Sequence, residues 1–272
     1  MNQLSEMSAQ GATFGVAAPA VFTCSVDDGH PADLRVAAML ASHGLRGTFY
    51  VPIRNREQRP VLAAAALREL DRNFEVASHT LDHCYLDQVT LHQAQQQISC
   101  GKSALEQVLG HGVCGFCYPG GRNRRVHRQA VQNAGFTYAR TTVNLHLEAG
   151  KLAWAMPTTM QFYPHSRSVL MRNMARAGAW PRRMEACLLA LQHTCWIERI
   201  EALIRHAAAA GRVCHLWCHG WEIEQLDAWQ AFDRVLATAS RCFHPEQCLT
   251  NGDLADITYR RRATAAARGV AP

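Results

Sequence analysis

The most constraining stretch of the sequence is residues 21–30, Val-Phe-Thr-Cys-Ser-Val-Asp-Asp-Gly-His, where an apolar run ends at two adjacent carboxylates. The β-branched, apolar run predicts a buried strand over residues 21–26, with Asp27 and Asp28 at its carboxyl end. Gly29 permits a sharp turn there. Two like charges side by side repel each other, and a cation or a proton between them relieves the repulsion. The stretch therefore indicates either a site that holds a metal and handles protons or an Asp-Asp-Gly turn on the surface.

Strand and helix patterns alternate along most of the chain. Short apolar runs predict strands over residues 21–26, 46–52, 74–78, 113–118, 136–142, 154–162 and 212–218. Apolar residues at helical spacing predict helices over residues 31–43, 60–72, 90–109, 124–134, 166–177, 183–210 and 228–240. This alternation is typical of a parallel sheet, open or closed, and 272 residues is an ordinary length for one α/β barrel.

Composition argues against several classes of protein. Hydrophobic residues make up 48% of the chain, which favours a sizeable core over global disorder. The net charge of +6 comes partly from basic residues near the C-terminus. The sequence has no basic run interleaved with aromatic residues of the kind that would indicate nucleic-acid binding. No run approaches the ~18 apolar residues of a membrane span, and residues 1–20 lack the features of a secretory signal. The eleven cysteines, an odd number, are expected to be reduced thiols in a cytoplasmic protein.

Polar residues suited to chemistry follow several predicted strands. His79 and His83 come after the third strand, residues 119–121 (Pro-Gly-Gly) after the fourth, and His219 after the last. In parallel α/β folds the carboxyl ends of the strands are where sites are built. The i,i+4 spacing of the two histidines puts both imidazoles on one face of a helical turn. With Asp28 they make a set of two histidines and one carboxylate, which suits Zn or another divalent transition metal.

Four segments together resemble motifs of the polysaccharide deacetylases, carbohydrate esterase family four. Residues 26–29 (Val-Asp-Asp-Gly) are similar to the first motif, Phe-Asp-Asp-Gly, and residues 79–83 match the second, His-Ser/Thr-x-x-His. Residues 117–121 (Cys-Tyr-Pro-Gly-Gly) are similar to the third, Arg-x-Pro-Tyr-Gly, and residues 216–219 (Leu-Trp-Cys-His) resemble the fifth, Leu-x-x-His. The fourth motif, Asp-x-x-Asp-Trp, has no counterpart that we can place. The order and spacing of these segments over residues 21–220 are more specific than any one of them.

The resemblance implies a fold and a set of roles. The fold would be a distorted (β/α) barrel with about seven parallel strands in a single domain. The metal ligands would be Asp28, His79 and His83, and the cofactor a divalent metal, with Zn expected. Asp27 would be the general base that takes a proton from the attacking water, and His219 the general acid that protonates the leaving amine.

The third motif departs from the family pattern at two positions. Cys117 stands where the family has an arginine that steadies the base, and Arg122 or Arg140 is available to substitute. Gly120 stands where the family has a tyrosine, so its backbone N–H would hold the oxyanion without an aromatic wall. The neighbouring Pro119 is a further candidate substrate contact.

The last predicted strand and the residues after it leave several roles open. Trp217 and Trp221 either stack on sugar rings or pack in the core or rim, and Trp217 is kept as a candidate substrate contact. His215 competes with His219 as the acid but would lie deeper on the same strand face, so His219 is preferred. Glu222 either orients His219 or is a solvated charge.

The expected function is metal-dependent removal of the N-acetyl group from an acetamido sugar, in the biosynthesis of a surface polysaccharide such as an O-antigen. A cytoplasmic location would suit a nucleotide-linked or lipid-linked precursor. Two alternatives are a hydrolase of a non-sugar C–N bond, such as a cyclic ureide or imide, and a non-catalytic sugar-binding relative. Residues 1–20 are expected to be a flexible lead-in, residues 21–258 the catalytic domain and residues 259–272 a flexible basic tail.

Overall fold

Seven strands form one sheet in the order β5-β4-β3-β2-β1-β7-β6 in the computed structural model, which describes residues 20–260. The strands are β1 (Val21–Asp27), β2 (Thr48–Val51), β3 (Glu75–Ser78), β4 (Gly115–Cys117), β5 (Tyr138–Arg140), β6 (Met160–Gln161) and β7 (Val213–Cys218). Every pairing between neighbouring strands is parallel. The predicted α/β class with about seven parallel strands is confirmed.

The chain between the two edge strands curls the sheet. Met156 forms a parallel bridge with Arg140 of β5, and its amide donates to the carbonyl of Ala139 at 2.8 Å. Four residues later, Met160 pairs with Leu216 of β7. One short segment therefore contacts both edges, which gives the distorted barrel that the family resemblance implies.

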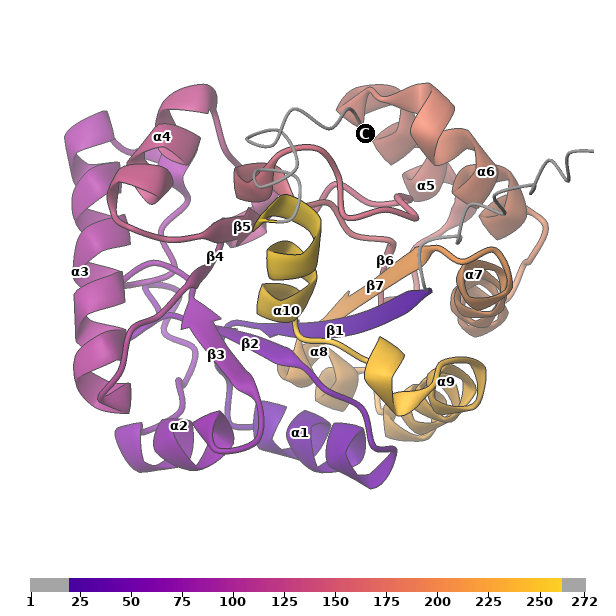
Figure 1. Cartoon of the computed structure of the whole chain (residues 1–272), viewed down its shortest axis with the longest axis horizontal. Coiled ribbons are helices and arrows are strands. Elements are labelled where there is room, and N and C mark those ends of the chain that lie inside the picture. Colours follow the sequence, from indigo (N-terminus) through magenta and orange to yellow (C-terminus); the bar gives the residue numbers. More distant parts are fainter. Residues whose placement is uncertain (1–19, 261–272) are drawn as a thin grey trace, which may run out of the picture.

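Most of the helices lie around the outside of the sheet, and the last one lies in front of its middle (Figure 1). The helices are α1 (Asp33–Ser42), α2 (Ala64–Asp71), α3 (Leu91–Leu109), α4 (Arg125–Asn133), α5 (Arg167–Ala177), α6 (Trp180–Leu191), α7 (Trp196–Ala209), α8 (Gly220–Gln225), α9 (Trp229–Cys242) and α10 (Asn251–Ala255). Helix α3 shows why these segments fold as predicted. Its buried side chains Ala94, Ile98 and Leu105 recur at helical spacing, and Thr90 caps its start by accepting from the amide of Gln93.

The predicted helix over residues 183–210 is two helices, α6 and α7. The physical reason is Arg199, whose nearly buried guanidinium donates to the carbonyls of Ala190 and His193 at 3.2 and 3.3 Å. The side chain therefore satisfies carbonyls at the end of α6 that a continuous helix would use for its own hydrogen bonds. Helices α8 and α10 are short, and the periodicity of the sequence does not predict them.

Helix α10, in front of the middle of the sheet in Figure 1, covers the amino ends of the strands. The side chain of Asn251 donates to the hydroxyl of Tyr50 at 2.9 Å, and its amide donates to Thr48 at 2.8 Å. The next amide, from Gly252, donates to the buried carboxylate of Glu75 at 2.9 Å. Because this end is closed, the carboxyl ends of the strands are the accessible end of the barrel.

The expected lead-in of residues 1–20 and tail of residues 259–272 lie outside the described residues, apart from residue 20 and residues 259–260. Among the helices that are described, none combines the length and the apolar character needed to cross a bilayer. All eleven cysteines fall within the described range, and each is a free thiol.

Candidate active site

The carboxyl ends of three strands bring the predicted metal ligands, base and acid together. Asp27 ends β1 and Asp28 follows it, while His79 comes directly after β3 and His219 directly after β7. Strand β1 lies at the centre of the sheet, with β2 and β3 on one side and β7 on the other. Residues from opposite ends of the chain therefore meet around Asp28, as a parallel sheet requires.

The three predicted metal ligands lie within reach of a single ion. Oδ1 of Asp28 is 3.1 Å from Nε2 of His83 and 3.6 Å from Nε2 of His79. The ligand atoms of the three residues all lie within 4.8 Å of one another, and each residue is at most 4% exposed. The geometry therefore places together the set that the sequence predicts.

The two imidazoles meet through a tight turn, and the predicted helical turn is wrong. Thr80 and His83 have positive φ angles of 69° and 60°, and Asp28, directly after β1, has φ 81°. Such angles cost about 1–3 kcal/mol for residues other than glycine and persist only where surrounding contacts enforce them. The hydroxyl of Thr80 accepts from the amide of Cys84 at 3.0 Å and so supports this turn.

Helix α3 packs directly on the same turn. The amide of Leu81 donates to the carbonyl of Gln97 at 3.0 Å. One turn further along the helix, a Cβ added to Gly101 would lie 2.6 Å from the carbonyl carbon of Thr80. A glycine in the middle of a helix is therefore required here by the backbone that carries His83.

We expect Gly101→Ala to destabilise the protein, although this exchange in a helix interior ordinarily stabilises by about 1 kcal/mol. The added methyl group has only backbone to displace, so the expected loss is on the order of 1–3 kcal/mol. Urea unfolding would measure it, with Ser103→Ala on the exposed face of α3 as the matched control. A stability equal to or above that of the control variant would contradict this account of the turn.

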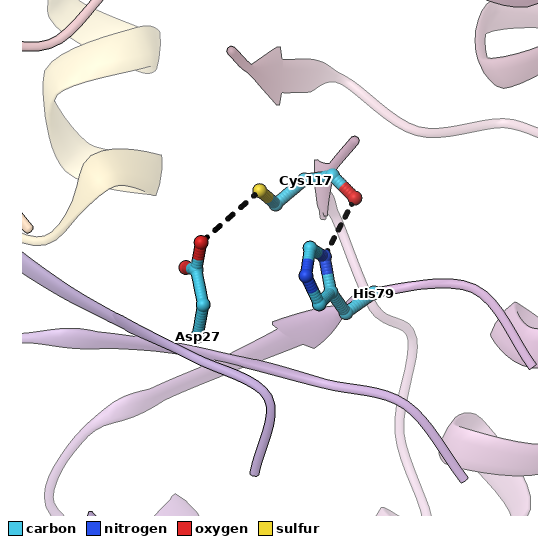
Figure 2. Close-up of side chains that lie close together, drawn as sticks. All are labelled: Asp27, His79 and Cys117. Carbon is cyan, nitrogen blue, oxygen red and sulfur yellow. Dashed lines mark hydrogen bonds between the residues drawn. The ribbon is translucent and has the colours of Figure 1, made fainter. Parts of the chain in front are cut away.

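The chemistry of the donor set fits a divalent metal. Nδ1 of His79 donates to the carbonyl of Cys117 at 2.9 Å (Figure 2), so Nε2, which lies 3.6 Å from Asp28, keeps its lone pair for an ion. Burial lowers the pKa of His79 to about 4, so this imidazole is neutral at pH 7. Burial alone would raise the pKa of Asp28, but the imidazoles of His83 and His219 lower it below its ordinary value. Within the described chain, Oδ1 of Asp28 and Nδ1 of His83 have no hydrogen-bond partner.

Asp27, the predicted base, is paired with Arg140. The guanidinium of Arg140 donates to Oδ1 of Asp27, and both side chains are at most 4% exposed. Burial by itself lowers the pKa of Arg140, but the charge of Asp27 raises it above its ordinary value, so Arg140 stays cationic. Arg122, the other candidate, is half exposed and lies 3.9 Å from the carboxylate of Asp87. Arg140 is therefore the residue that takes the place of the family's third-motif arginine.

The register of two strands explains how Arg140 reaches the base. Cys117 of β4 is the direct partner of Arg140 of β5. The small thiol leaves room for the longer side chain of the neighbouring strand to extend towards Asp27. Figure 2 shows the sulfur of Cys117 facing Asp27, with Sγ 3.8 Å from Oδ2. Burial raises the pKa of the Cys117 thiol, so it remains protonated beside the carboxylate.

His219, the predicted acid, is held by Glu222. Nδ1 of His219 lies 2.7 Å from Oε2 of Glu222, and Gln161 donates to the same oxygen at 2.9 Å. Nε2 of His219 lies 3.9 Å from Asp28 and thus faces the ligand set. Burial alone would lower the pKa of His219, but the hydrogen bond to Glu222 and the charge of Asp28 raise it to about 9. Of the two roles left open for Glu222, the geometry supports orientation of His219.

The rival acid, His215, lies away from the ligand set. It is 2% exposed, and its Nε2 is 2.9 Å from the hydroxyl of Ser25 and 3.3 Å from the amide of Asn251. Burial lowers the pKa of His215 well below its ordinary value, and the charge of Arg140 adds to this effect. His215 is therefore a neutral interior residue.

We expect Glu222→Gln to lower turnover about 10- to 100-fold and to move the alkaline limb of the rate profile to lower pH. An acid must carry its proton, so activity falls as pH rises through the pKa of His219. Loss of the Glu222 carboxylate removes a group that raises the pKa of His219, so that pKa falls. The pKa falls whether or not Asp28 is charged. A pH series of kcat would measure it, with Glu224→Gln, an exposed carboxylate on the same helix, as the control. An unmoved alkaline limb would contradict the pairing.

The loop after β4 forms one wall of the site. Pro119 is buried, and Gly120 has φ 61°, a conformation that favours glycine. A Cβ on Gly120 would lie 2.7 Å from Cε1 of Tyr85, so the ring of Tyr85 supplies an aromatic surface at this position. Trp217 is 8% exposed, and the centroid of its ring lies 5.0 Å from Cζ of Arg140. The ring therefore packs against the arginine that holds Asp27.

Sequence reasoning did not predict several contacts to the ligand set, including that of Trp221, which was weighed only for sugar stacking or packing. The indole of Trp221 donates to Oδ2 of Asp28 at 2.9 Å, and Arg59 lies 3.7 Å from the same oxygen and stacks on the indole ring. Nδ1 of His83 is 3.7 Å from Glu57. Glu57 and Arg59 could have been proposed from their position, because the charged loop that carries them follows β2, the neighbour of β1.

Both the sequence and the fold resemble those of known proteins. Residues 17–139 match the family model of polysaccharide deacetylase. The fold resembles that of a candidate polysaccharide deacetylase from Mycobacterium smegmatis, at 15% identity and a TM-score of 0.61, covering 90% of this chain and 95% of that one. It also resembles a family 4 acetyl xylan esterase from Clostridium thermocellum in complex with a cobalt ion, at 14% identity and a TM-score of 0.53, covering 87% and 90%.

Other matches are partial. A Streptococcus pyogenes deacetylase in complex with acetate aligns at 18% identity and a TM-score of 0.46, over 50% of this chain and 62% of that one. No curated protein matches the sequence. At these identities the solved structures show the fold, while the family model matches residues 17–139, a little less than half of the chain. The resemblance to the polysaccharide deacetylases, a family of deacetylase hydrolases, that the motifs predict is therefore confirmed over residues 17–139.

Proposed function

We propose that this protein is a metal-dependent hydrolase that removes the N-acetyl group from an acetamido sugar. One observation carries the proposal. A buried carboxylate held by Arg140 and an imidazole held by Glu222 both adjoin the same set of ligands, Asp28, His79 and His83. A base and an acid beside a metal site are the groups that hydrolysis of an amide needs.

The proposed cofactor is a divalent metal held by Asp28, His79 and His83, with Zn expected from the two imidazoles and one carboxylate. When bound, the ion supplies a Lewis acid that polarises the amide carbonyl and lowers the pKa of water towards about 7. The unpartnered Oδ1 of Asp28 and the fixed tautomer of His79 support this assignment.

The remaining chemistry is assigned to side chains and one backbone N–H of the protein itself. Asp27 accepts the proton of the attacking water while Arg140 holds its other oxygen. The backbone N–H of Gly120 binds the oxyanion, and Nε2 of His219 gives its proton to the departing amine nitrogen. The C–N bond breaks, and the products are acetate and a free amino sugar. Pro119 and Trp217 remain proposed substrate contacts.

The protonated state of His219 favours an amide over an ester as the substrate. An amine is a poor leaving group unless it is protonated, whereas an alkoxide leaves more readily. The hydrogen bond between Nδ1 of His219 and Glu222 favours the protonated imidazole, the form that amide cleavage requires. The C. thermocellum relative is an acetyl xylan esterase, so the family match alone does not choose between N-acetyl and O-acetyl groups.

The proposed setting is a cytoplasmic step of surface-polysaccharide biosynthesis, acting on a soluble or carrier-linked precursor. The support is the odd number of cysteines, eleven, which is typical of a reducing compartment. Expression of a tagged chain in its own cell, followed by fractionation, would test this location.

Metal analysis combined with a substrate panel would test the function. We expect about one divalent ion per chain, acetate release from N-acetylhexosamines, and loss of both the ion and the activity in Asp28→Asn. The panel should include an O-acetylated xyloside, a cyclic imide and a cyclic ureide. Ring opening without acetate release would support the non-sugar hydrolase instead. Sugar binding without turnover on any substrate would support the binding protein.

A further inference from the structure

A polar cleft beside the loop of Gly120 carries cationic and amide groups that the proposed reaction does not use. Its volume is about 590 Å³, within the range of small-molecule sites. The groups in its lining that matter here are Arg122, Arg176, Asn144 and Asn173. No carboxylate lines this cleft among the described residues. The lining therefore combines positive charge with hydrogen-bond donors.

Asn144 presents its amide N–H groups to this cleft. The side chain is 7% exposed, and its Oδ1 accepts from Nη2 of Arg183 at 3.1 Å. Because guanidinium can only donate, the oxygen of Asn144 is fixed on that side, and Nδ2 is the atom left for the cleft. Within residues 20–260, Nδ2 of Asn144 has no acceptor. Nδ2 is therefore a donor that a ligand in the cleft can use.

Behind the cleft wall lies a buried cation without an anionic partner. Arg183 is fully buried, and its guanidinium donates only to amide and carbonyl oxygens. These oxygens belong to Asn144, Asn173, Met174 and Gly178. No carboxylate in the described chain forms an ion pair with it. Burial lowers the pKa of Arg183. Because a guanidinium keeps its proton in proteins, the side chain remains charged.

The two arginines at the rim add exposed charge. Arg176 is exposed and has no ion-pair partner in the part of the chain that the structure describes. Arg122 has its nearest carboxylate, Asp87, at 3.9 Å and is 50% exposed. Guanidinium groups present forked donors that match the oxygens of phosphate and carboxylate.

We propose that this cleft binds an anionic group, a phosphate or a carboxylate, carried by the acetamido sugar; this inference rests on the proposed function. Gly120 lines the cleft, and its N–H is the proposed oxyanion donor, so one molecule can reach both places. A second cleft of about 360 Å³ shares Val143 with the first and adds Arg128, Lys151 and Arg182 against the single carboxylate of Glu148. The cationic surface thus extends away from the catalytic residues.

The test compares Arg176→Gln with Arg172→Gln, an exposed arginine on the same helix that does not line the cleft. Calorimetry on the metal-loaded protein would measure binding of inorganic pyrophosphate. We expect about tenfold weaker binding in Arg176→Gln and unchanged binding in Arg172→Gln. The ion is present in both variants, so pyrophosphate bound to it cancels in the comparison. Equal affinities in the two variants would overturn the proposal.

Acetate release then connects the cleft to the substrate. The probes are N-acetylglucosamine 1-phosphate, an N-acetylhexosaminuronic acid and a neutral N-acetylhexosamine methyl glycoside. We expect kcat/KM to favour an anionic sugar by about tenfold, with the preferred anion identifying phosphate or carboxylate. Arg176→Gln should lose that preference and leave the neutral rate unchanged. A preference that survives Arg176→Gln would contradict the proposal. Failure of all three sugars would overturn the proposed function, whereas pyrophosphate binding would still test the cleft.

Discussion

Asp27→Asn is expected to lower kcat for acetate release by about 10²- to 10⁴-fold while leaving the metal content unchanged. Asparagine has nearly the shape of aspartate but cannot accept the proton of the attacking water. Asp27 is also absent from the set Asp28, His79 and His83, so that set stays intact. Turnover and metal stoichiometry, measured on the same preparation, would check both parts.

Asp233→Asn is a suitable control for this experiment. Asp233 is an exposed carboxylate on α9 that pairs with His43, far from the strand ends that carry the site. The control should retain both turnover and metal. If Asp27→Asn kept full turnover, Asp27 would not be the base. If Asp27→Asn lost both turnover and metal, Asp27 would instead belong among the ligands.

Arg140→Met is expected to destabilise the fold by about 3–5 kcal/mol, which is a large part of the stability of a typical domain. The substitution keeps most of the side-chain volume but leaves the charge of Asp27 buried without its partner. Guanidinium chloride unfolding would measure the loss. Acetate release should fall together with it, because Arg140 also holds Asp27 in position.

The double variant Asp27→Asn with Arg140→Met separates charge from packing. Replacing both members of a buried pair removes the unpaired charge, so most of the lost stability should return. Turnover should remain as low as in Asp27→Asn. If the double variant were as unstable as Arg140→Met, the loss would come from packing against Trp217 and Tyr50 and not from the ion pair.

Much of the fold could be predicted because strands and helices have different periods. The strand and helix patterns place seven parallel strands, and the capping box at Thr90 gives the start of α3. The break between α6 and α7 could not be predicted. Its cause is Arg199, whose hydrogen bonds to carbonyls exist only once the helices have packed. Similarly, α10 is stabilised by contacts to β2 and β3 that are distant in sequence.

The candidate ligands could be predicted because they sit at strand ends in short motifs. Their partners could not, because hydrogen bonds across the sheet depend on strand order and register. Arg140 was one of two candidates until the pairing of β4 with β5 placed it beside Cys117. The contacts of Trp221 and Tyr85 were equally hidden, since Trp221 lies on α8, a short helix that the periodicity does not predict, and Tyr85 lies in a loop whose path the sequence does not give.

The pairing of Cys117 with Arg140 also constrains how such a site can evolve. An arginine at position 117 in addition to Arg140 would place two cations in one small space. Losing Arg140 while Cys117 remains would leave the carboxylate of Asp27 without a cationic partner. Passing between this arrangement and that of the family motif therefore requires two coupled exchanges, with a damaged intermediate on either route. A lineage that has adopted one solution is expected to keep it.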